Sequence, residues 1–83
     1  VCGEVVGTYC ARSVGGEPTF LDFEAPHPDQ AFKVVIWGKN LPRFGDAETI
    51  YRGKRVCATG EIRMHRGKPQ IVARDPSQLR VEP

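Results

Sequence analysis

The sequence predicts an all-β fold, a small five-stranded barrel with one short helix between the third and fourth strands. Short runs rich in β-branched and aromatic residues are separated by clusters of glycine, proline and aspartate, which is typical of strands joined by turns. One stretch, residues 39–53, lacks the alternation with period two that marks a strand. A chain of 83 residues is long enough for a single domain, which we expect to cover 1–83.

The first three strands are expected in the N-terminal half of the chain. The first covers about 1–11, and the glycines and the proline of SVGGEP predict a turn after it. The second covers about 18–24. The loop EAPHPDQ follows it, because its two prolines do not fit a central strand. The third strand, AFKVVIWG at 31–38, is rich in β-branched and aromatic residues.

The helix is expected within the stretch KNLPRFGDAETIYRG, which follows the third strand. Asp46 can serve as its N-cap, because a short carboxylate side chain accepts hydrogen bonds from the first free backbone N–H groups. Gly53 is placed to end it, because glycine readily adopts the left-handed conformation found after helices.

The C-terminal part predicts two more strands. The fourth covers 54–66, the turn RGKP follows, and the fifth covers 69–74. The final piece, LRVEP, is expected to prolong the fifth strand after a break at Pro76. Gly7 and Gly60 fall inside predicted strands, where glycine often marks a bulge or bend.

Five strands with a helix between the third and the fourth is the order of the OB-fold, a Greek-key barrel. Closing this barrel pairs the first strand with the fourth, which brings Cys2 and Cys57 together and allows a disulfide between them. A disulfide would imply an extracytoplasmic location, periplasmic or secreted. The alternative is a cytoplasmic protein with three reduced thiols, Cys10 included.

Period-two alternation assigns side chains to the two faces of the sheet. In the second and third strands the apolar set is expected to point inward: Leu21, Phe23, Phe32, Val34 and Ile36. The opposite set is expected to point outward: Phe20, Asp22, Lys33, Val35 and Trp37. In the fourth strand the residues expected to point inward are Val56, Ala58, Ile62 and Met64.

The segments PTFLDF, PDQAFKVVIWG and YRGKRVCATGEIRMHRGKPQIVARDPSQL resemble a group of small bacterial OB-fold domains of the nucleic-acid-binding class. Members of the group occur in exported proteins or beside nuclease-like and other DNA-processing domains. The resemblance covers about residues 1–81 and implies the OB architecture with a nucleic-acid ligand. Exported members carry cysteines at positions like Cys2 and Cys57, whereas Cys10 departs from their pattern.

The outward rings and nearby cations predict a surface for single-stranded DNA or RNA. An exposed ring can stack on any base, and lysine or arginine can follow the phosphates. Residues 31–83 carry eleven basic and five acidic side chains, a net charge of +6 that suits an anionic partner. The expected binding residues are Phe20, Lys33, Trp37, Arg63, His65, Arg66, Lys68 and Arg74.

Other interpretations of the same residues stay open. In the first, Phe20 closes one end of the barrel, and the helix or the loop 39–45 covers Trp37, with Phe44 packed on it. The same face would also suit a protein partner or a fused domain, which would make the chain an exported structural or interaction module. A third reading is an oligosaccharide ligand stacked on Trp37.

Catalysis, metals and cofactors are not expected. The carboxylates of Asp22, Glu24 and Asp29 are spread over a strand and a proline loop, which is not the spacing of a metal site. No CxxC pair predicts zinc, and nothing places His27 beside His65. No apolar run approaches the ~18 residues of a membrane helix, so no membrane insertion is expected.

Overall fold

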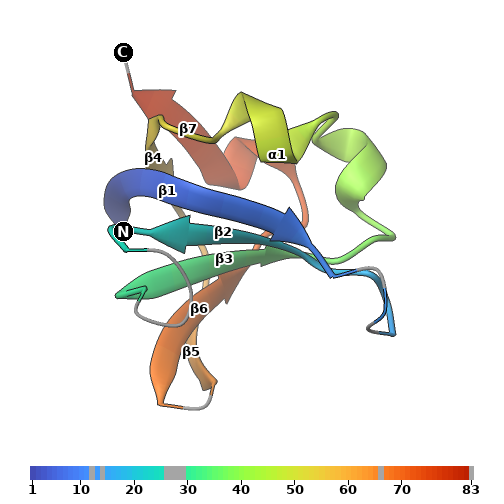
Figure 1. The fold of residues 1–83 in the computed structure, drawn as a ribbon, viewed down its shortest axis with the longest axis horizontal. Coiled ribbons are helices and arrows are strands. Elements are labelled where there is room, and N and C mark those ends of the chain that lie inside the picture. Colours follow the sequence, from blue (N-terminus) through green and yellow to red (C-terminus); the bar gives the residue numbers. More distant parts are fainter. Residues whose placement is uncertain (12, 14, 26–29, 66, 83) are drawn as a thin grey trace.

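The computed structural model describes residues 1–11, 13, 15–25, 30–65 and 67–82. Within them one sheet of seven strands, in the order β5-β6-β3-β2-β1-β4-β7, curls into a half-barrel (Figure 1). The short helix α1 packs against β1 and β2. The strands are β1 Cys2–Cys10, β2 Thr19–Phe23, β3 Phe32–Ile36, β4 Arg55–Ala58, β5 Ile62–His65, β6 Lys68–Val72 and β7 Leu79–Glu82; α1 is Ala47–Ile50, and 3-10 turns cover Leu41–Arg43 and Pro76–Gln78.

The prediction of a mostly β fold with one short α-helix between the third and fourth strands is confirmed, but the count of five strands is wrong. The expected fourth strand divides into β4 and β5 around Gly60, whose φ of 154° departs from strand geometry. A 3-10 turn at Pro76–Gln78 separates β7 from β6. The Asp75 side chain caps this turn by accepting a hydrogen bond from the Ser77 backbone N–H, which also lowers the pKa of Asp75.

The strand pairing explains the curl of the sheet. β1 is antiparallel to β2 and to β4, so the long first strand connects two parts of the sheet. β3 is parallel to β6, and β4 also pairs with β7. The expected contact between the first and fourth strands is confirmed, with Cys2 directly opposite Cys57. The β1–β2 register shifts between Val5 and Gly7, which confirms the expected bulge near Gly7.

The core lies on the inner face of the half-barrel. All five side chains of β2 and β3 that were predicted to point inward are at most 5% exposed. The expectation that Ile62 and Met64 are buried inside the barrel is wrong, because their side chains are 52% and 67% exposed. They lie in the β5–β6 hairpin, which extends away from the rest of the sheet (Figure 1). Alternation therefore assigned these two side chains to the correct face, but that face is exposed to water at the hairpin.

Replacing Gly60 with alanine should lower the stability of the fold, and Gly15 provides a matched control. A Cβ at this position would lie 2.8 Å from Ile71 Cγ2, and the positive φ also disfavours any side chain. We expect Gly60→Ala to lower the free energy of unfolding by about 1–3 kcal/mol. Gly15→Ala is the control, because a Cβ there would meet nothing within 4 Å. Urea unfolding measures both, and equal losses would contradict the steric argument.

Candidate nucleic-acid interface

Two neighbouring rows of side chains cross the outer face of the sheet. Residues that are directly opposite in adjacent strands share a face, so the register defines each row. One row, named here the aromatic row, consists of Tyr9, Phe20, Val35 and Val72 from β1, β2, β3 and β6. The other, the polar row, consists of Gly7, Asp22, Lys33, Gln70 and Arg63 from β1, β2, β3, β6 and β5.

Phe20 is at the centre of a cluster of one cation and two rings. Its ring centroid lies 5.0 Å from that of Tyr9, and the planes are inclined by 37°. The Nζ atom of Lys33 lies 4.8 Å from the centroid of Phe20, within the range of a cation–π contact. Phe20 is half-buried, and Tyr9 is 38% exposed. Both expected residues, Phe20 and Lys33, therefore lie together on the outer face with Tyr9.

Tyr9 was missed by the sequence reasoning. Alternation was applied to later strands but not to the first, where it separates Tyr9 from its inward neighbour Thr8. The bulge between Val5 and Gly7 interrupts this alternation, so Val5 is inward as well. Burial raises the pKa of the Tyr9 hydroxyl, and the nearby Asp22 carboxylate raises it further. The ring is therefore a neutral phenol near pH 7, which can both stack and donate a hydrogen bond.

Asp22 and Val35 fall on the outward face as predicted, but both are only 2% exposed, so the outer face is partly covered at these two positions. Gly7 lies directly opposite Asp22 in β1. A Cβ on Gly7 would lie 3.6 Å from Asp22 Oδ2, an ordinary contact distance, so the carboxylate lies directly beside this glycine. Lys33 lies opposite Asp22 in the adjacent strand, which keeps the two opposite charges close.

Trp37 follows β3 and is half-buried. Its ring lies against the backbone of Gly16, where a Cβ would come within 3.0 Å of Trp37 Cε3. A hollow of about 310 Å³ beside it is lined by Gly16, Trp37 and Lys39. Phe44, which was considered as a cover for Trp37, is 5% exposed and belongs to the core cluster. The indole is thus neither sealed nor fully exposed, and it borders a hollow with a cation.

The predicted cations gather around the β5–β6 hairpin. Arg63 forms an exposed ion pair of 3.1 Å with Glu61, and Lys68 Nζ donates a hydrogen bond of 3.1 Å to the Gln30 carbonyl. His65 lies opposite Lys68 in the register and is exposed. A second hollow, of about 260 Å³, is lined by Glu61, Arg63, Val72, Arg74 and Gln78. Arg66 lies outside the described residues.

The structure thus divides the predicted site into three parts. Phe20 and Lys33 are in contact, Arg63 and Arg74 border one hollow at the end of the aromatic row, and Trp37 borders another with Lys39. An exposed ion pair such as that of Arg63 contributes about 0–1 kcal/mol, so a phosphate could replace Glu61 at little cost. The arrangement can stack unpaired bases and neutralise phosphates.

The candidate disulfide lies apart from these rows, at the β1–β4 pair. The sulfur atoms of Cys2 and Cys57 are 2.09 Å apart, a disulfide distance, and Cys10 is a free, half-buried thiol. Such a pair is compatible with an oxidising, extracytoplasmic location. In the part of the chain that the structure describes, no helix has the length and apolar character needed to cross a membrane.

Comparisons of this chain with protein-family models, with curated proteins and with solved structures find no match. Its function is therefore inferred from the outer face of the sheet. That face combines rings and cations, and one of the two hollows borders it at Val72.

Proposed function

We propose that this domain is an OB-fold module that binds single-stranded nucleic acid on its outer face and has no catalytic activity of its own. The fold part of the proposal is supported by the strand pairing. If β4 with β5, and β6 with β7, are each taken as one interrupted strand, five strands remain, with α1 between the third and the fourth. The first strand then pairs with the second and the fourth, as in a Greek-key barrel.

The proposal that the ligand is nucleic acid rests on the contact of Phe20 with both Tyr9 and Lys33 on the outer face of the sheet. An unpaired base can stack on such rings, whereas the bases of a duplex are already stacked on each other. Lys33 covers the Phe20 ring in the free protein, and an arriving base would displace its ammonium group toward a phosphate. The polar row and the hairpin cations then follow the backbone of the strand.

The test is binding of labelled dT and dA oligomers and of a matched RNA oligomer, followed by fluorescence anisotropy. Four described cations, Lys33, Arg63, Lys68 and Arg74, would each release about 0.7 counterion from a single strand. We therefore expect log K to fall against log salt concentration with a slope of about −3. Absence of binding to any of the oligomers at ~20 mM salt, where screening is weakest, would overturn the proposal.

A protein-docking module is the second candidate, and the exposed side chains of Ile62 and Met64 favour it. They lie on the hairpin face opposite to that of Arg63 and so form no part of either row. The two functions can therefore be separated by mutation. Changes at Met64 should affect a protein partner, whereas changes at Phe20 should affect nucleic acid.

A further inference from the structure

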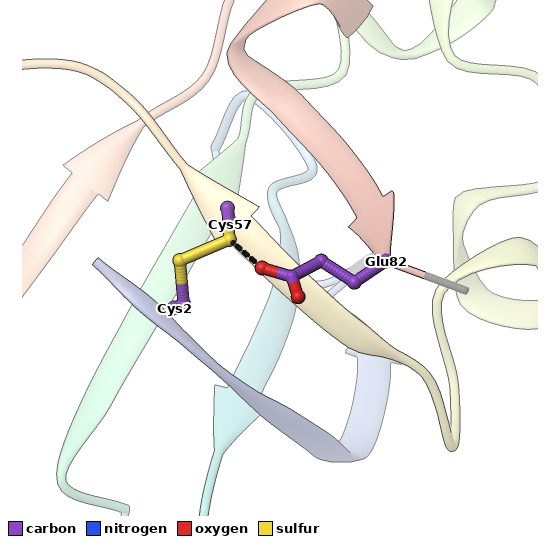
Figure 2. Close-up of side chains that lie close together, drawn as sticks. All are labelled: Cys2, Cys57 and Glu82. Carbon is purple, nitrogen blue, oxygen red and sulfur yellow. Dashed lines mark hydrogen bonds between the residues drawn. A yellow bond between two sulfur atoms is a disulfide. The ribbon is translucent and has the colours of Figure 1, made fainter.

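Three strands bring two sulfur atoms and a carboxylate together at the β1–β4–β7 corner, away from the proposed nucleic-acid site. Figure 2 shows Cys2 from β1, Cys57 from β4 and Glu82 from β7, with the carboxylate directed at Cys57. Their ligand atoms all lie within 4.8 Å of one another. Among the described residues, this is the one group of three or more His, Cys, Asp or Glu side chains that meets this condition.

The contact between Cys57 and Glu82 suits the reduced state of the corner. Glu82 Oε1 lies 2.6 Å from Cys57 Sγ. A sulfur atom in a disulfide carries no proton to donate, whereas the thiol formed on reduction can donate one to this carboxylate. A carboxylate is therefore already placed beside the sulfur that reduction would release.

The backbone holds the three ligands in reach of one cation. Cys2 and Cys57 are directly opposite in paired strands, with Cα atoms 3.9 Å apart, and β7 lies on the other side of β4. Tetrahedral zinc has Zn–S bonds of about 2.3 Å and Zn–O bonds of about 2.0–2.2 Å, which places the ligand atoms about 3.5–3.8 Å apart. This spacing is within the 4.8 Å limit that the three ligand atoms already satisfy.

The surrounding charges also suit such a site. Two thiolates and one carboxylate carry a charge of −3, which a divalent cation reduces to −1. Arg80 lies opposite Cys57 in the β4–β7 register, and Arg55 lies opposite Glu82. Both arginines are thus on neighbouring positions of the same face, where they can balance the remaining charge.

We propose that reduction of the Cys2–Cys57 bond converts this corner into a site for one thiophilic cation, held by Cys2, Cys57 and Glu82 with a fourth position open to water. A dithiol gives two electrons to the S–S bond and becomes a cyclic disulfide, and its two protons pass to the cysteine sulfurs. Binding of Zn²⁺ then releases those two protons to solvent. This site is independent of the proposed nucleic-acid function.

The experiment compares oxidised and reduced protein. The chain is reduced with a dithiol, desalted without oxygen, and titrated with Zn²⁺ against a chromophoric chelator. We expect one Zn²⁺ per reduced chain and none per oxidised chain. Cd²⁺ in place of Zn²⁺ should produce the ultraviolet charge-transfer band of a thiolate–cadmium bond. Equal zinc binding by the two redox forms would overturn the proposal.

Variants assign the ligands. Cys2→Ser and Cys57→Ser should each abolish the cadmium band, whereas Cys10→Ser should leave zinc affinity unchanged. Glu82→Gln should weaken binding about tenfold or more, since even indirect supporting residues contribute 10–100-fold. Glu4→Gln is its control, because Glu4 is an exposed carboxylate on the same strand as Cys2 and outside the three-residue group. An unchanged affinity in Glu82→Gln would overturn the three-ligand site.

A loss of structure on reduction would not hide the result. Circular dichroism is recorded before and after zinc addition, because a metal that binds the folded chain also drives folding. A reduced chain that unfolds should regain its β spectrum when zinc is added. Failure to regain it would count against the site.

Discussion

Replacing both Cys2 and Cys57 with serine should lower the free energy of unfolding by about 4 kcal/mol. The bridge joins residues separated by 55 positions, and the entropy that such a loop removes from the unfolded chain corresponds to about this amount. A small domain has a total stability of only about 5–15 kcal/mol. The melting temperature should therefore fall by on the order of 20 °C.

Thermal and urea unfolding in the presence of a chelator measure this effect without a contribution from metal. Cys10→Ser is the matched control, because Cys10 is outside the bridge and its thiol makes a long contact of 3.9 Å with the Glu17 carbonyl. We expect it to change the free energy of unfolding by less than about 1 kcal/mol. Wild-type protein with a reductant should have a melting temperature close to that of the double variant. A melting temperature that does not change when the reductant is added would contradict the bridge.

The positions of the inner side chains were predictable from the sequence, because alternation with period two is a property of the strand itself. Leu21, Val34 and Ile36 followed it and are fully buried. The pairing of Cys2 with Cys57 was predictable for a different reason. In a Greek-key barrel the first strand pairs with the fourth, so strands that are far apart in the chain become neighbours.

Exposure was not predictable in the same way, because it depends on what covers a face. Ile62 and Met64 point inward but lie beyond the part of the sheet that could cover them. Asp22 points outward and is nevertheless buried, with Gly7 directly opposite it in β1. Alternation assigns a side chain to a face, and only the assembled sheet decides whether that face meets water.

Two other features depend on contacts that no local pattern records. A glycine such as Gly60 predicts an irregularity, but whether the strand bends or ends there depends on how the residues on either side of it pair with other strands. The contribution of Glu82 to the cysteine corner depends on β7 pairing with β4. No pattern in the sequence of Leu79–Glu82 indicates which strand it pairs with.

The largest functional effect is expected when both rings of the aromatic row are removed. Stacking contributes about 1–3 kcal/mol per base, so Tyr9→Ala combined with Phe20→Ala should weaken oligomer binding on the order of 100-fold or more. Phe20→Leu keeps an apolar side chain without a ring, and it should weaken binding while preserving most of the packing. Met64→Ala is the matched control, because Met64 is 67% exposed and faces away from the row.

The salt dependence separates stacking from electrostatic attraction in the same variants. Removing rings leaves Lys33, Arg63, Lys68 and Arg74 in place, so the slope of log K against log salt concentration should stay near about −3 while the affinity falls. Lys33→Ala should instead reduce the slope by about 0.7. Anisotropy titrations at several salt concentrations measure both quantities. If Met64→Ala weakened binding as much as Phe20→Ala, the rings would not be the contact, and the hairpin face would replace the aromatic row as the binding surface.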